Sequence, residues 1–207
     1  MKNRHPIAAI LAVIGYAIMI VPIFFVVAIS FNAGDTLTFP PAEVSLRWFG
    51  AALGYERFIN ALVTSLIVAV VATFLGLALG VPAALALARS NLKAKAAIQN
   101  VFLSPLIVPE LVLGAALYQQ LAIPLRLQNY LPVLILGHTI LMLPYAVRVT
   151  RASLANLDAQ AEEAARMLGA SPVRFFDVTL PMLRPGIFSA ALLSFITSFN
   201  NVPLRCC

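Results

Sequence analysis

Long runs of apolar residues, separated by short polar segments, extend along the whole chain. We predict that these runs are membrane-spanning helices, because each is long enough to reach the roughly 17–25 residues that cross a bilayer core. Five spans are expected, over residues 7–30, 59–88, 96–121, 131–147 and 186–202. The first exceeds the apolar part of a secretory signal, about 7–15 residues, so we interpret it as an uncleaved helix.

The composition supports a membrane protein. Hydrophobic residues make up 61% of the chain and charged residues 11%. In a typical soluble domain about 45–50% of the residues are apolar and about 25% are charged. A soluble enzyme, a disordered tail and a collagen-like rod are excluded. The two cysteines, Cys206 and Cys207, are adjacent, so neither a disulfide framework nor a cysteine metal site is expected. The predicted fold is an all-α, polytopic transmembrane helix bundle that forms one domain over residues 1–207.

Lysine and arginine are unevenly divided between the two sides that five spans create. With the N-terminus inside, ten of the 14 basic residues lie in inner segments: Lys2, Arg4, Arg89, Lys93, Lys95, Arg148, Arg151, Arg166, Arg174 and Arg184. Because cytoplasmic loops are enriched in such residues, the N-terminus and the large 148–185 loop are expected in the cytoplasm. The same bias accounts for the net charge of +6, so no nucleic-acid partner is expected.

Small residues recur every four positions in the second span, at Ala72, Gly76, Gly80 and Ala84. At this spacing they form a flat stripe on one helix face, on which another helix backbone can pack closely. The stripe is therefore predicted to pack against another helix of the same subunit or to form a seam between two subunits.

Two ionisable residues lie within predicted spans. Glu110 is the only acidic residue there, and an intramembrane carboxylate is a candidate functional group. It could contact substrate, take part in gating or a subunit contact, or cap backbone groups freed by Pro105 and Pro109. His138 in the fourth span is interpreted first as a hydrogen-bonded packing residue, with a ligand or proton-relay role as the alternative.

The cytoplasmic segment is predicted to form a helix, a tight turn and a second helix. Asp158 is a suitable N-cap, Gly169 is placed where a glycine ends a helix, and Ser171-Pro172 suits the next helix start. The first helix carries a shallow, alanine-rich face, and Glu163 has no oppositely charged residue at i+4. This face is expected to dock on a partner or to rest on its own bundle.

The same segment resembles a known family. Glu163-Ala164-Ala165, followed by Gly169 and then by Leu180-Pro181, is similar to the EAA loop of permease subunits of binding-protein-dependent ABC importers. Residues 45–49 and 143–147 resemble the spermidine/putrescine-type branch of that family. The resemblance extends from about residue 7 to residue 203.

The resemblance implies a type I ABC importer permease whose EAA helix docks on a cytoplasmic ATPase. The positions that it assigns to ATPase coupling are Glu162, Glu163, Ala164, Ala165, Gly169, Leu180 and Pro181. It also makes Asn200 and Asn201, together with Glu110, candidates for the translocation path. ATP hydrolysis is expected on a separate chain because no GxxxxGK[ST] pattern occurs here. Neither a cofactor nor a metal is expected.

The implied partners are cytoplasmic ATPase subunits, a second permease subunit that is homologous or identical, an external substrate-binding protein and the lipid bilayer of the inner membrane. The implied substrate is a polyamine such as spermidine or putrescine, with an opine, a phosphonate or an iron compound as alternatives. Six spans are typical of the branch, so the chain is interpreted as C-terminally truncated. A non-functional remnant and an intramembrane enzyme are the rival hypotheses, although no HExxH or GxSxG pattern supports an enzyme.

Overall fold

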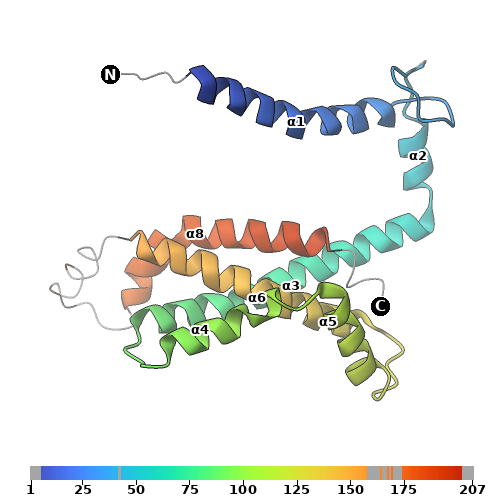
Figure 1. Ribbon diagram of the computed structural model, residues 1–207. Helices are drawn as coiled ribbons and strands as arrows, with labels where there is room; N and C mark the ends of the chain where they lie inside the picture. The colour runs from blue at the N-terminus through green and yellow to red at the C-terminus, as the bar shows by residue number, and fades with distance from the viewer. Residues whose placement is uncertain are drawn as a thin grey trace. The chain divides into compact units, whose positions relative to one another are not determined.

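The computed structural model describes residues 6–41, 43–157, 164, 167, 169 and 174–201, and helices dominate this part of the chain (Figure 1). The predicted all-helical fold is confirmed. The chain divides into two compact units, Met1–Leu62 and Val63–Cys207, which are described separately below.

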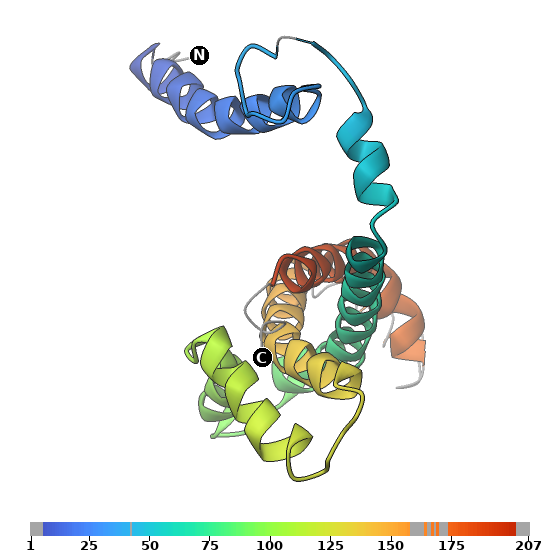
Figure 2. The ribbon, with the colours of Figure 1, turned by 90° about the vertical axis from the view of Figure 1, so that its right-hand side faces the viewer.

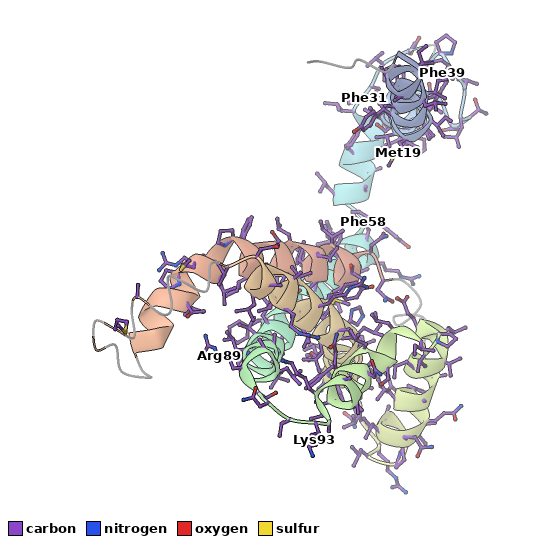
Figure 3. All side chains as sticks on the ribbon, turned by 60° about the vertical axis from the view of Figure 1, so that its left-hand side comes forward. Met19, Phe31, Phe39, Phe58, Arg89 and Lys93 are labelled. Atoms are coloured by element: carbon purple, nitrogen blue, oxygen red, sulfur yellow. The ribbon has the colours of Figure 1, made fainter. Side chains whose placement is uncertain are left out.

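The first unit begins with helix α1, Pro6–Ser30, of 25 residues. At about 1.5 Å per residue it is long enough to cross a hydrocarbon core of about 30 Å. Its apolar side chains are exposed within this chain, as illustrated by Met19 at 69% (Figure 3). Such a surface is stable only against lipid or another apolar surface, which agrees with the predicted first span.

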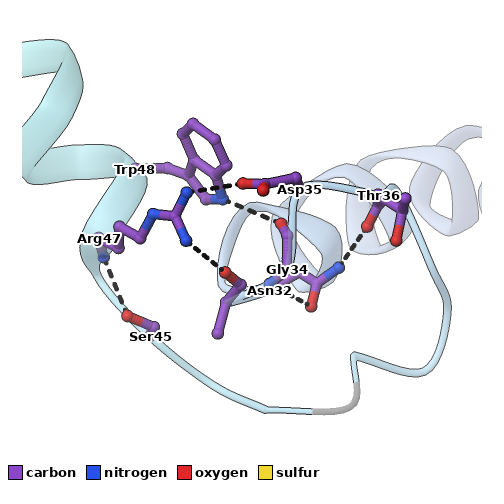
Figure 4. A network of polar contacts seen from close by, with 8 residues as sticks. Asn32, Gly34, Asp35, Thr36, Ser45, Arg47 and Trp48 are labelled. Carbon is purple, nitrogen blue, oxygen red and sulfur yellow. Dashed lines mark hydrogen bonds and ion pairs between the residues drawn. The ribbon is translucent and has the colours of Figure 1, made fainter.

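A polar network orders the loop between α1 and the short helix α2, Arg47–Leu53 (Figure 4). The Arg47 guanidinium lies 2.6 Å from an Asp35 carboxylate oxygen and 4.7 Å from the centre of the Trp48 ring. The Trp48 indole N–H donates to the Gly34 carbonyl at 3.3 Å. Asp35 therefore already has a cationic partner, so its charge is partly neutralised.

Three long helices are neighbours in the second unit: α3, Glu56–Arg89, which begins in the first unit; α6, Leu131–Ala155; and α8, Arg174–Phe199 (Figures 1 and 2). Helices α4, Lys95–Leu103, and α5, Glu110–Leu117, both contact α6. Helix α6 therefore lies at the centre of this unit.

The third predicted span, 96–121, is not one straight helix. It consists of Lys95–Leu106 and Glu110–Ala122, which meet at an angle of 88°. Pro105 and Pro109 explain the break: proline has no N–H to donate, and it disfavours helical backbone in the residue before it. Pro109 itself has ψ of 130°, outside the helical region. The segment ends in a π-helical turn at Tyr118–Ala122.

The fourth and fifth helices are longer than the spans predicted at 131–147 and 186–202. Helix α6 extends to Ala155, and α8 begins at Arg174 and contains Pro181 and Pro185, which lie within the predicted 148–185 loop. Burial of Thr179 and Leu183 on this part of α8 supplies packing that outweighs the helix-breaking tendency of the two prolines.

By length and composition, the described part of the chain contains four helices able to cross a membrane, or five if the bent pair counts as one span. The predicted number of five is thus approximately supported. The predicted helix–turn–helix falls largely outside the described residues. Within it, Ala164 and Met167 have helical backbone and exposed side chains.

Candidate translocation and coupling sites

The small-residue stripe of α3 packs against α6 of the same chain. Ala72, Gly76, Gly80 and Ala84 are all buried. A β-carbon added at Gly80 would lie 2.6 Å from the Ala146 Cβ, and one added at Gly76 would lie 3.1 Å from the Met142 Cβ. The two helices therefore approach closely because these positions lack side chains. Of the two alternatives for this stripe, the geometry favours packing within one subunit.

A buried polar pair joins α6 to α8. The Nδ1 atom of His138 lies 2.8 Å from the Ser198 hydroxyl oxygen, and both residues have 0% exposure. A hydrogen bond between membrane helices contributes about 0.6 kcal/mol on average and up to about 1.7. The packing role that the sequence favours for His138 agrees with this geometry, and Ser198 is the partner that sequence reasoning missed.

Further hydroxyl groups lie between the helices of the second unit. Among the described residues, the hydroxyls of Thr73, Thr150 and Ser194 are buried and have no hydrogen-bond partner. Thr73 also lines a groove of about 300 Å³ between α3 and α8, whose other walls are apolar and include Phe188 and Phe195. Unsatisfied polar groups are costly in a low-dielectric interior, so these three hydroxyls, one each from α3, α6 and α8, make the interface of these helices a candidate functional region.

The three candidate path residues occupy different environments. Glu110 is half-buried and is the first residue of α5, directly after the break of the third span. The positive end of the α5 dipole favours a carboxylate there. Asn200 is exposed and Asn201 is buried at the end of α8. Among the described residues Glu110 makes no hydrogen bond or ion pair with either asparagine, so the structure does not bring the three residues together in one polar cluster.

The candidate coupling residues are only partly described. Glu162, Glu163 and Ala165 lie outside the described residues. Gly169 has φ of 77°, in the left-handed region that glycine adopts easily, as expected for a residue that ends a helix. Leu180 and Pro181 are exposed, and both lie within α8 rather than in a loop.

Basic residues lie where α3 ends and α4 begins, and Figure 3 labels Arg89 at the end of α3 and Lys93 in the turn that follows. Arg89, in the last turn of α3, donates from Nη2 to the Thr179 hydroxyl of α8 at 3.4 Å. The Lys95 ammonium donates to the Ala88 carbonyl at 3.0 Å, which satisfies a group at the α3 C-terminus. The Arg89–Thr179 contact, like Ser198, was not predicted. The only sequence signal for the buried α8 face is the recurrence of small and hydroxyl residues such as Ser194 and Ser198 four positions apart.

Comparisons with known proteins identify the family and the relatives of this chain. Residues 76–204 match the family described as "Binding-protein-dependent transport system inner membrane component". The chain is 30% identical over 206 residues to the putrescine transport system permease protein PotI of Escherichia coli (strain K12). The aligned stretch covers 96% of this chain and 73% of PotI.

Two other relatives differ in what their names say they transport. The chain is 27% identical over 199 residues to the diacetylchitobiose uptake system permease protein DasC of Streptomyces coelicolor, covering 93% of this chain and 72% of the relative. It is 34% identical over 156 residues to the molybdenum transport system permease protein ModB of Haemophilus influenzae, and the aligned stretch covers 69% of this chain and 68% of that relative.

Proposed function

Because the chain belongs to the family of binding-protein-dependent transport system inner membrane components, we propose that it is the permease subunit of an ATP-driven polyamine importer. Members of this family are transport subunits rather than enzymes, and ATP hydrolysis belongs to a separate chain. The observation that carries the substrate proposal is the 30% identity to the putrescine permease over 96% of this chain.

The charges of the outer loop do not by themselves select a cation. Asp35, in the loop between α1 and α2, is paired with Arg47 at 2.6 Å. Glu110 lies at the bend of the third span, where it is the first residue of α5. In this proposal its carboxylate meets an ammonium group of the polyamine after the external binding protein has delivered it.

The proposed assembly contains cytoplasmic ATPase subunits and a second permease subunit, homologous or identical to this one. The N-terminus and the 148–185 segment face the cytoplasm, in accordance with the distribution of basic residues. The EAA residues Glu162 to Ala165 dock on the ATPase, and the left-handed turn at Gly169 sets the direction in which the chain returns toward α8.

Uptake by the purified complex tests the function. The chain would be reconstituted in liposomes with its ATPase, binding protein and partner permease, with ATP enclosed. Labelled putrescine, spermidine, a disaccharide and molybdate would be offered separately. ATP-dependent accumulation of putrescine or spermidine, and not of the other two, is expected.

Accumulation of the disaccharide or molybdate alone would support the corresponding relatives and contradict the polyamine assignment. A Glu110→Gln variant provides a second measurement, because it removes the charge and keeps the shape of the side chain. A higher KM for putrescine is expected, by about tenfold, a size typical of a lost charge-assisted contact. An unchanged KM would remove Glu110 from the path.

A further inference from the structure

Helices α6 and α8 approach each other closely near residues 156–173, which connect them and are called the coupling segment below. A β-carbon added to Gly186 would overlap both the hydroxyl oxygen and the Cβ of Ser153. The hydroxyl could rotate away, but the Cβ of Ser153 is fixed by its backbone. Any side chain at position 186 therefore forces the two helices apart at this point.

The chain between these two residues carries the EAA positions. Ser153 lies in the last turn of α6, and Gly186 lies in α8 just after Pro181 and Pro185. A proline inside a helix removes one backbone hydrogen bond, so α8 has fewer such bonds on the loop side of Gly186. The Ser153–Gly186 contact therefore joins α6 to α8 near the ends from which the coupling segment leaves and returns.

The other end of the same helix pair is also held. His138 of α6 and Ser198 of α8 are 2.8 Å apart and fully buried. The contacts pair residue 153 with 186 and residue 138 with 198, so the two helices are antiparallel. At about 1.5 Å per residue, the two contacts are separated by about 20 Å along each helix. The two contacts therefore connect α6 and α8 at both ends of this stretch.

We propose that Gly186 is a positioning residue for coupling: its missing side chain lets α6 and α8 move as one rigid pair when the ATPase displaces the EAA segment. This inference rests on the proposed function, since it needs an ATPase to supply the motion. It concerns the transmission of motion and does not depend on which substrate is carried.

The test uses the complete permease complex in liposomes and the variant Gly186→Ala. Binding of the ATPase should be retained, because the substituted position is not among the EAA residues. The number of substrate molecules taken up per ATP hydrolysed should fall by about tenfold, within the usual range of coupling between distant sites. The ATPase rate should also lose its stimulation by the loaded binding protein.

Rescue separates this role from a merely structural one. Ser153→Gly removes the atoms that the new side chain meets, so Gly186→Ala combined with Ser153→Gly should recover coupling to within about twofold of the original complex. Gly15→Ala is the matched control, because a β-carbon at Gly15 in α1 would meet nothing within 4 Å. It should leave coupling unchanged.

Normal coupling in Gly186→Ala would overturn the inference, as would a coupling loss that Ser153→Gly does not restore. These outcomes are distinct from failure of the polyamine assignment, which would show as absence of putrescine and spermidine uptake by the unmodified complex. In that case the stimulation of ATPase activity by the loaded binding protein still measures the effect of Gly186.

Discussion

At the scale of single residues, the membrane interior of this protein is organised by a few small or polar side chains. His138 and Ser198 form a hydrogen-bonded pair between α6 and α8 with no exposure to solvent. The pair fixes the rotation of each helix about its axis, because a polar group in hydrocarbon is stable only opposite a partner. Dispersion contacts among leucines would not specify one rotation so narrowly.

Ser198→Ala should lower the free energy of unfolding by about 0.6–1.7 kcal/mol, the range measured for hydrogen bonds between membrane helices. The measurement is thermal or detergent-induced unfolding of the purified permease. Ser30→Ala is the control, since the exposed Ser30 hydroxyl bonds only to the Val27 carbonyl one turn earlier in its own helix. Equal stabilities of the two variants would show that the buried pair contributes nothing.

Gly169→Leu should reduce uptake without disturbing membrane insertion. A non-glycine residue with φ near 77° is strained by about 1–2 kcal/mol. No atom lies within 4 Å of an added β-carbon in the described structure, so the effect comes from the backbone conformation and not from a clash. Gly169→Asn should retain most activity, because asparagine tolerates this conformation better. Similar uptake by both variants would contradict this explanation.

At the scale of elements, close backbone approach decides which helix faces are buried. Helix α3 is apolar around most of its circumference, yet the buried residues fall on the face that carries Gly76 and Gly80. Leucine-rich faces gain nothing by leaving lipid for protein, whereas a small-residue face gains dispersion contacts over a large backbone surface. The same physics places Gly186 of α8 against Ser153 of α6.

Gly80→Ala should destabilise the permease by about 1–3 kcal/mol despite the better helix propensity of alanine, because the new β-carbon would lie 2.6 Å from the Ala146 Cβ. Thermal unfolding in detergent provides the measurement. The double variant Gly80→Ala with Ala146→Gly should regain most of the loss. Failure of that second change to restore stability would mean that the α3–α6 packing differs from this structure.

At the scale of the whole molecule, the family assignment and the helix lengths together describe a multi-pass membrane protein. The proposed orientation of the chain rests on a different property, the position of its basic residues. Ten of the 14 lie in segments assigned to one side, and cytoplasmic loops retain such residues because they are not readily translocated.

Cysteine labelling tests this orientation in a background where Cys206 and Cys207 are replaced. Thr36→Cys, in the exposed loop after α1, should react with a membrane-impermeant reagent added to intact cells. Asn156→Cys, in the exposed turn after α6, should react only after the cells are opened. The reverse pattern would place the N-terminus and the coupling segment outside.

The sequence by itself determined the properties that arise from summed local preferences. Long apolar runs predicted the membrane helices, and the EAA pattern identified the transporter family. The left-handed turn at Gly169 was also expected from a glycine placed at a helix end. Each of these depends on a continuous stretch of chain, so it can be recognised without knowing what packs against it.

Only the tertiary structure decided how the helices bend, continue and meet. Pro105 and Pro109 break the third span at 88°, whereas Pro181 and Pro185 remain inside α8. The sequence offers the same residue type in both places, and the difference lies in the surrounding packing. The His138–Ser198 pair and the Ser153–Gly186 contact likewise join residues distant in sequence. Their partners follow from the crossing of helices, which is set by the complementary shapes of whole faces and not by any local pattern.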